Sequence, residues 1–234
     1  MSGHLNPGGQ QFRDDDGAAD PRVATALAAY QAGRGSEHDA LTALAAARLL
    51  VPVIAVLADG SAAEGDKNSE MVLPTLIGQD GRPAVLAFTG LDTLARWRRN
   101  ARPVPAEADR VWRAAAADGC AVVIDVAGPV PLAVEGTRLA ALAAGRPVPA
   151  AYQDGDVRAE VEAAVAAEPA IAGFSLAPSH QVDLAVRLHL AAGNGTGGNW
   201  RPAVNQVAQS IAARLAGRLR RGVEFGVTRD PIGS

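Results

Sequence analysis

The sequence predicts an α+β or α/β protein of two modules, a mixed-sheet domain followed by a smaller α+β module. Three observations support this prediction. Between residues 20 and 146, short apolar runs alternate with segments whose apolar residues recur at helical spacing. The stretch 146–156, with two prolines and a turn signal, has the composition of a linker. After it the pattern restarts, in the order helix, strand, strand, helix, strand.

The N-terminal part is predicted to be a disordered tail, residues 1–19, followed by two helices. The tail is polar and rich in Gly, Gln and Asp, so few apolar side chains are present whose burial would offset the entropy of ordering. Asp20 and Pro21 are typical of a helix N-cap and first turn, and Gly33 is typical of a helix end. Ser36 begins a capping segment for the second helix. A strand at 51–57 and a polar loop at 58–70 follow.

The central pattern predicts four strands and three helices. The run 120–126 is apolar on both faces, which is typical of an interior strand. Trp97 and Trp112 each fall on the apolar side of a helix, so we expect both in the core. The expected elements are strands 71–77, 83–88, 120–126 and 131–134 and helices 91–99, 105–118 and 137–144.

The second module is predicted to be a small α+β unit. Its expected elements are helix 157–167, strands 172–177 and 182–190, helix 202–221 and strand 223–228. A glycine-rich loop, 193–199, precedes the second helix but lacks the Lys-Ser/Thr ending of a phosphate-binding loop. Its glycines are therefore interpreted as a flexible connection.

One segment of the chain carries a family resemblance. Residues 71–97, MVLPTLIGQDGRPAVLAFTGLDTLARW, contain a strand, the turn Gly78-Gln79-Asp80-Gly81, a second strand and a helix that begins after Phe88-Thr89-Gly90. This succession resembles the SseB family, which is named for enhanced serine sensitivity in bacteria. The resemblance continues through the turn at 125–129 and the closing helix at 139–145, with Val126 where the family pattern has proline.

The resemblance implies a domain organisation but no reaction, because no biochemical activity is firmly established for the family. It implies an SseB N-terminal-like domain at 20–146, a linker at 147–154 and an SseB C-terminal-like module at 155–230. Family members are sometimes labelled sulfurtransferase-like. Cys120, however, begins an apolar strand and lacks the loop of backbone donors that would activate a thiol, so we expect a buried structural cysteine.

Composition narrows the class of protein. A net charge of −3 gives no overall attraction for nucleic acid or anionic lipid. No apolar run approaches the ~20 residues that span a membrane, and the N-terminus lacks the apolar core of a signal peptide. Cys120 is the only cysteine, so an intramolecular disulfide is excluded. We expect a soluble, cytoplasmic bacterial protein without a membrane partner, while its oligomeric state stays open.

Catalytic and metal-binding patterns are missing from the sequence. The histidines do not form a pair with metal-ligand spacing, and one cysteine cannot complete a zinc cluster. No Gly-x-Ser-x-Gly elbow supplies a serine nucleophile. We therefore expect a protein that is not an enzyme and that holds no metal or cofactor.

Three residues are candidates for a pocket between the modules, as part of an enzyme or a small-molecule binder. Asp125 ends a buried strand, where acids of α/β active sites often lie; its alternative role is to cap the turn at Gly128. Arg187 and His189 alternate with apolar residues on strand 182–190, so they share one face. A solvated strand face is the simpler interpretation of that pair.

Two arginine clusters complete the candidates. Arg214, Arg218 and Arg221 follow at helical spacing beside the apolar stripe of helix 202–221 and could bind an acidic protein or RNA. A solvated helix face is the favoured interpretation, and replacement of all three by Gln should then leave the fold intact. The second cluster, Arg96, Arg98, Arg99 and Arg102, surrounds Trp97 at the end of a helix, where cations complement the helix dipole.

The sequence thus favours a non-catalytic interaction or regulatory protein with an unidentified protein partner. The first alternative is an enzyme or small-molecule binder whose pocket residues are scattered along the chain. The second is an RNA- or ribosome-associated protein that binds through the arginine-rich helix face.

Overall fold

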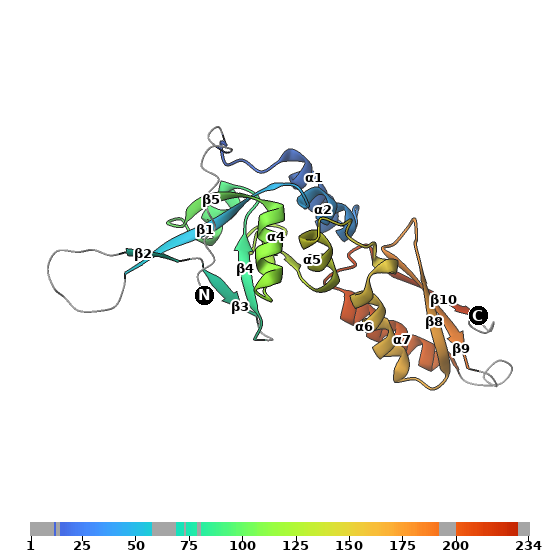
Figure 1. Ribbon diagram of the computed structural model, residues 1–234. Helices are drawn as coiled ribbons and strands as arrows, with labels where there is room; N and C mark the ends of the chain where they lie inside the picture. Colours follow the sequence, from blue (N-terminus) through green and yellow to red (C-terminus); the bar gives the residue numbers. More distant parts are fainter. Residues whose placement is uncertain are drawn as a thin grey trace. The chain divides into compact units, whose positions relative to one another are not determined.

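The computed structural model describes Phe12 and residues 15–57, 69–72, 74–78, 81–191 and 200–228 (Figure 1). The fold is a mixed α+β fold, as the sequence predicts. The chain divides into two compact units. The N-terminal unit consists of Met1–Thr25 and Thr42–Pro147, and the C-terminal unit consists of Ala26–Leu41 and Val148–Ser234.

The described residues of the N-terminal unit form two small sheets. The antiparallel sheet has the order β2 (Ser69–Val72), β1 (Arg48–Leu57), β5 (Arg102–Glu107). The mixed sheet has the order β3 (Thr75–Ile77), β4 (Pro83–Ala87), β6 (Ala121–Ile124), β7 (Leu132–Val134). Only the central pair, β4 and β6, is parallel. A bridge between Leu50 and Phe88 joins β1 to the residue after β4, so both sheets contribute to one core.

The described part of this unit also contains the helices α3 (Leu91–Trp97), α4 (Ala108–Ala117) and α5 (Gly136–Ala143). One cluster of its core consists of Leu50, Leu86, Phe88, Leu94 and Ala101. Trp112 on α4 is completely buried, whereas Trp97 is half-buried against this cluster. The expected core position is therefore confirmed for Trp112, whereas Trp97 is only partly buried.

The C-terminal unit is a three-stranded sheet with two helices on one face (Figure 1). Its elements are the short 3-10 helix η1 (Ala151–Gln153), α6 (Gly155–Ala166), β8 (Ile171–Ala177), β9 (Leu184–Leu190), α7 (Trp200–Leu215) and β10 (Val223–Thr228). The central strand β9 is antiparallel to β8 and parallel to β10. Alternate β9 residues from Leu184 to Leu190 pack with apolar residues of α6 and α7, as their spacing predicts.

Helices α1 (Pro21–Gln31) and α2 (Glu37–Leu44) contribute residues to both units. The segment Ala26–Leu41 clusters with the C-terminal unit, although the sequence pattern assigns it to the domain 20–146. Tyr30 shows the physical reason. It is fully buried, and its hydroxyl donates to the backbone oxygens of Gly217 at 3.2 Å and Arg218 at 3.0 Å.

Further elements differ from the sequence prediction. The run expected as one strand at 71–77 contains the end of β2 and the whole of β3, which belong to different sheets. Residues 102–107 form strand β5, so the helix expected at 105 begins only at Ala108. Pro103 and Pro105 disfavour helix, and the segment pairs with β1 along its whole length. The expected tail 1–19 also differs, because Gly17 accepts a 2.8 Å hydrogen bond from the Leu91 amide and Asp15 pairs with Arg48 at 2.8 Å. Residues 1–11, 13 and 14 lie outside the described residues.

In the described part of the chain, none of the helices combines the length and the apolar character needed to cross a membrane.

Candidate functional site

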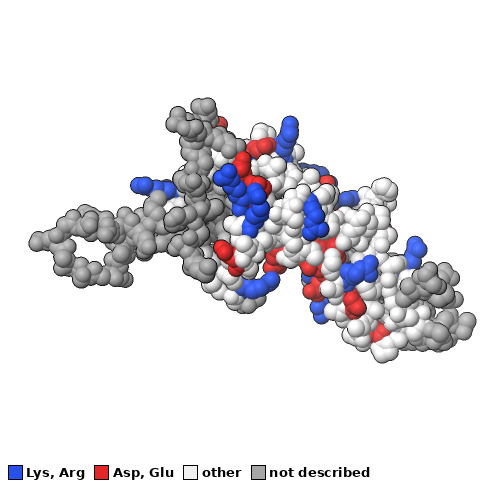
Figure 2. All heavy atoms as spheres, in the orientation of Figure 1, with Lys and Arg blue, Asp and Glu red and all other residues white. Residues whose placement is uncertain are grey.

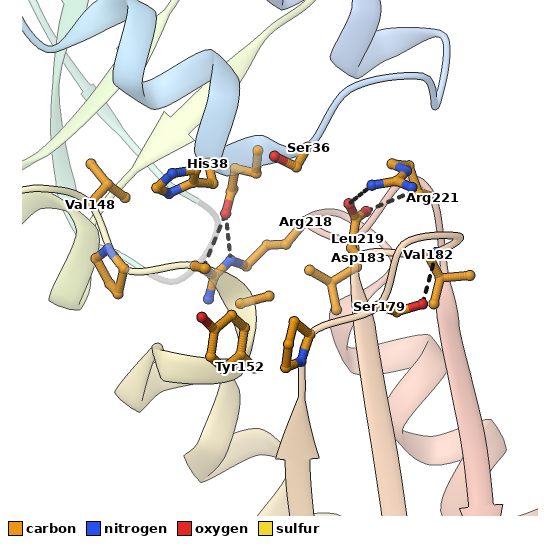
Figure 3. A pocket seen from close by; sticks show the side chains of 15 residues that line it. Ser36, His38, Val148, Tyr152, Ser179, Val182, Asp183, Arg218, Leu219 and Arg221 are labelled. Atoms are coloured by element: carbon orange, nitrogen blue, oxygen red, sulfur yellow. Dashed lines mark hydrogen bonds and ion pairs between the residues drawn. The ribbon is translucent and has the colours of Figure 1, made fainter.

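The C-terminal unit contains a pocket of about 160 Å³ (Figure 3). Four segments line it: residues 36–38 at the start of α2, residues 148–152 before and within η1, residues 178–183 between β8 and β9, and residues 218–221 after α7. The side chains of Val148, Val182 and Leu219 form apolar parts of the wall, and charged side chains stand beside them. The topology brings these segments together from positions up to 185 residues apart.

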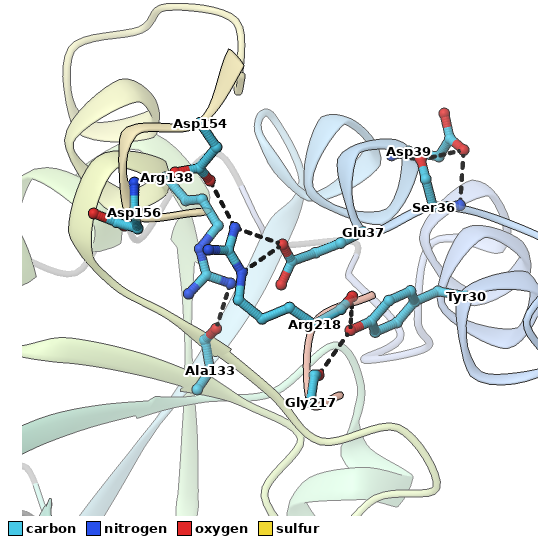
Figure 4. A network of polar contacts seen from close by, with 10 residues as sticks. All are labelled: Tyr30, Ser36, Glu37, Asp39, Ala133, Arg138, Asp154, Asp156, Gly217 and Arg218. Carbon is cyan, nitrogen blue, oxygen red and sulfur yellow. Dashed lines mark hydrogen bonds and ion pairs between the residues drawn. The ribbon is translucent and has the colours of Figure 1, made fainter. Parts of the chain in front are cut away.

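Arg218 forms the most buried ion-pair network beside this pocket (Figure 4). Its Nη2 donates to Asp154 Oδ2 at 2.6 Å, and its Nε and Nη2 donate to Glu37 Oε2 at 3.2 and 3.1 Å. The Arg218 side chain is 18% exposed, that of Glu37 8% and that of Asp154 0%. Burial acts to lower the pKa of Arg218, but the two carboxylates outweigh it and hold the pKa above its ordinary value. The guanidinium is therefore a permanent charge between two buried acids.

Local structure explains how these groups come together. Asp154 is the N-cap of α6, where its Oδ1 accepts a hydrogen bond from the Asp156 amide at 2.8 Å. Its other carboxylate oxygen, Oδ2, accepts the hydrogen bond from Arg218. Helix α7 ends at Leu215, so Arg218 lies in the turn that follows. Tyr30 binds the backbone of this same turn, which places Glu37 of α2 beside the guanidinium.

Asp183 is the second buried acid that lines the pocket. Its side chain is 3% exposed, and its Oδ2 accepts a 2.8 Å hydrogen bond from the Arg221 amide. Its Oδ1 is buried and has no hydrogen-bond partner within the described residues; Arg221 Nη1 lies 4.0 Å away. Burial raises the pKa of Asp183, the backbone hydrogen bond and charge of Arg221 oppose the rise, and the carboxylates of Glu37 and Asp39 add to it.

The raised pKa of Asp183 predicts a stability change with a definite sign. Between its ordinary pKa of 3.8 and the raised folded value, the folded state holds the proton more tightly, so the stability of the wild type falls as pH rises. Asp183→Asn should therefore be at least as stable as the wild type at pH 7. Its advantage should disappear as the pH falls below about 3.8, where both states are protonated. Urea unfolding midpoints measured from pH 3 to pH 8 test this.

Asp154→Asn is the matched control for that prediction. It also keeps an oxygen that can cap α6, but it removes a carboxylate that neutralises the buried Arg218. It should therefore lower the unfolding midpoint at pH 7. A clear loss of stability in Asp183→Asn at pH 7 would contradict the assignment of Asp183 as a strained, desolvated carboxylate.

Asp125, a sequence-predicted pocket residue, belongs to the N-terminal unit and is buried. Its carboxylate accepts hydrogen bonds from the Thr89 amide at 2.9 Å, the Thr89 hydroxyl at 2.7 Å and the Thr93 hydroxyl at 2.6 Å. Its backbone has a positive φ of 48°, and its carbonyl accepts from the Gly128 amide at 2.7 Å. The side-chain contacts join the residue after β6 to the start of α3, and the backbone contact with Gly128 closes the turn that follows β6.

Arg187 and His189 belong to the C-terminal unit, on strand β9. Arg187 is exposed, whereas His189 is buried with its Nε2 3.3 Å from Ser175 Oγ on β8. The prediction of a wholly solvated strand face is therefore wrong for His189. The 160 Å³ pocket is lined by other residues, and Arg187, His189 and Asp125 are not among them.

The expected arginine stripe does not exist as one helix face. Arg214 lies on α7, is 46% exposed and pairs with Glu160 at 2.8 Å. Arg218 and Arg221 lie beyond the helix end, are 18% and 23% exposed, and pair with buried acids. The prediction fails because the arginines keep helical spacing past Leu215 although α7 ends there, and the acids that attract the last two are remote in sequence. The RNA-binding alternative loses the surface on which it was based.

Two other sequence candidates have separate outcomes. Cys120 is partly exposed, and its thiol lies 3.6 Å from the Asp118 carbonyl oxygen, so the expected full burial is wrong. The glycine-rich loop 193–199 lies outside the described residues. Over the residues that the structure describes, no cluster of three or more His, Cys, Asp or Glu side chains is arranged to hold a metal ion.

Comparison with known proteins identifies the N-terminal part of the chain. The family model of the SseB protein N-terminal domain matches residues 23–141, just over half of the sequence. No curated protein and no solved structure matches the chain. The matched region contains the segment 71–97, which carries the sequence resemblance. The chain therefore belongs to the SseB family.

Proposed function

We propose that this chain is a non-catalytic interaction or regulatory protein of the bacterial cytoplasm, and that the pocket of its C-terminal unit receives a side chain of a protein partner. The strongest support is that the charged side chains of the pocket wall already form ion pairs with buried acids of the same unit. Arg218 is bound by Glu37 and Asp154, and Arg221 pairs with Asp183 and donates to the His180 carbonyl at 2.7 Å. Such a wall is fixed before a partner arrives, which lowers the entropic cost of binding.

The size and lining of the pocket favour a side chain over a metabolite. Its volume of about 160 Å³ is below the roughly 300–1,000 Å³ of typical small-molecule pockets. Apolar residues of the wall stand beside groups that are already desolvated. Binding hot spots in protein interfaces combine these properties, because a side chain that enters such a recess loses its water completely.

A pocket-filling variant tests this proposal. Val182→Phe places a larger side chain in the pocket wall, and Val227→Phe makes the same change at an exposed position of β10 outside it. Cross-linked pull-downs from the native host should recover a partner with wild type and Val227→Phe but not with Val182→Phe. Equal thermal midpoints of the two variants would show that the loss is not caused by unfolding.

Recovery of the same proteins by all three chains would refute the pocket as the docking site. A hydrolytic, transferase or redox activity of the purified chain that Val182→Phe abolishes would refute the non-catalytic role.

A further inference from the structure

The N-terminal unit carries four exposed arginines within seven residues. Arg96 lies in the last turn of α3, Arg98 and Arg99 follow the helix, and Arg102 begins β5. Within the described part of the chain, none of the four forms an ion pair with an acid, although Asp92 lies one helical turn before Arg96. We call residues 96–102 the arginine segment.

Seven other arginines of the described chain are neutralised by an acid, whereas Arg22, Arg34, Arg146 and Arg201 are exposed and form no ion pair among the described residues. Arg48, Arg82, Arg110, Arg113, Arg214, Arg218 and Arg221 each pair with an Asp or Glu. Figure 2 shows basic and acidic side chains interspersed on the face in view. The arginine segment differs in how closely its charges lie, since four arginines that form no ion pair among the described residues fall within seven positions. Four like charges so close together repel one another, and an anionic ligand would relieve that repulsion.

The backbone of the arginine segment is fixed. The Arg98 amide donates to the Leu94 carbonyl at 2.8 Å, and the Ala101 amide donates to the Arg98 carbonyl at 3.2 Å. Ala101 is buried in the core cluster, and Arg102 pairs in register with Val53 of β1. The four side chains therefore project from an ordered turn, so a ligand would bind at little cost in backbone entropy.

The aromatic ring in this segment is already engaged. The Trp97 ring contacts Phe88 with a centroid distance of 5.5 Å, and the Arg98 guanidinium lies 5.5 Å from the Trp97 centroid. Single-stranded nucleic acids usually bind by stacking bases on free aromatic faces. Trp97 is poorly placed for such stacking, so the recognition groups of this surface are the guanidinium groups.

We propose that the arginine segment is a docking surface for an acidic, Asp- and Glu-rich segment of a protein partner. Guanidinium groups bind carboxylates through two parallel hydrogen bonds, a match of geometry as well as of charge. A short acidic segment contacts only this surface, whereas a long polyanion such as RNA would also meet the rest of a chain whose net charge is −3. Like the proposed function, this proposal assumes a protein partner. The arginine segment belongs to the N-terminal unit, however, whereas the pocket belongs to the C-terminal unit.

Fluorescence anisotropy with a labelled octaglutamate peptide tests the proposal, with a labelled ten-nucleotide uridine RNA as the competing probe. The test variant replaces Arg96, Arg98, Arg99 and Arg102 with Gln. The control variant replaces Arg22, Arg34, Arg146 and Arg201, four exposed arginines elsewhere, and changes the net charge equally. At 50 mM salt the test variant should lose roughly tenfold or more in peptide affinity, and the control should stay close to wild type. Wild-type affinity should also fall as salt is raised to 300 mM.

Three outcomes would overturn the proposal: no peptide binding by the wild type, an equal loss in the control variant, or tighter binding of the RNA than of the peptide. If the fourfold variant does not fold, the pair Arg96→Gln and Arg99→Gln provides the same comparison against Arg22→Gln and Arg34→Gln. Val182→Phe should keep the wild-type peptide affinity, so a failure of the pocket proposal and a failure of this one are measured separately.

Discussion

Arg218→Ala should lower the free energy of unfolding by about 3–5 kcal/mol, as expected when one partner of a buried ion pair is removed. In the wild type the side chains of Glu37 and Asp154 are 8% and 0% exposed, and the substitution removes the cation that they share. Two buried carboxylates without that charge would repel each other and lack the hydration that they have in the unfolded chain. Urea denaturation followed by circular dichroism at pH 7 measures the effect.

Arg214→Ala is the control for this prediction. Arg214 and Glu160 are separated by 2.8 Å, a distance similar to that in the Arg218 network, but both side chains are nearly half exposed. Exposed pairs of this kind contribute roughly 0–1 kcal/mol, so the control should lose far less stability. A third variant, Arg218→Met with Glu37→Gln and Asp154→Asn, removes all three charges and should recover much of the loss. Equal losses in Arg218→Ala and Arg214→Ala would show that burial is not the source of the effect.

Most elements were predictable from the sequence because their signals are local. The apolar run that contains β6, the Asp154 cap before α6 and the alternation along β9 each depend on neighbouring residues. Strand β5 has no comparable local signal, because its conformation depends on pairing with β1, which lies about fifty residues earlier. The prolines at 103 and 105 were the available signal, since they disfavour a helix that starts there.

The candidate site was not predictable to the same degree. Glu37 and Arg218 are 181 residues apart, and nothing in the local pattern of either residue specifies the other. The arginines of helix 202–221 were therefore interpreted as a surface, although burial and ion pairing define two of them. Gly217 was the local signal that could have ended the helix early, because glycine is common just beyond a helix C-terminus. Even so, the buried acids could be identified only from the fold.

The assignment of Ala26–Leu41 to the C-terminal unit leads to the second prediction of large effect. The stretch expected to be a linker, 147–154, contains η1 and the buried N-cap Asp154, and the fragment Val148–Ser234 should not fold alone. It lacks Tyr30, which binds the turn at Gly217 and Arg218, and Glu37, which neutralises Arg218. Losing a buried aromatic residue and a buried ion-pair partner costs several kcal/mol, comparable to the roughly 5–15 kcal/mol that stabilises a whole domain.

Restoring the missing segment is the decisive comparison. A chain in which residues 26–41 are joined to 148–234 by a flexible Gly-Ser linker should show a cooperative thermal transition and dispersed amide resonances, whereas 148–234 alone should show neither. The same chimera with Tyr30→Ala and Glu37→Ala should behave like the fragment, because these two side chains provide the contacts to the turn after α7. A folded 148–234 fragment would instead show that Ala26–Leu41 is dispensable, and that the boundary between independently stable parts lies at the linker.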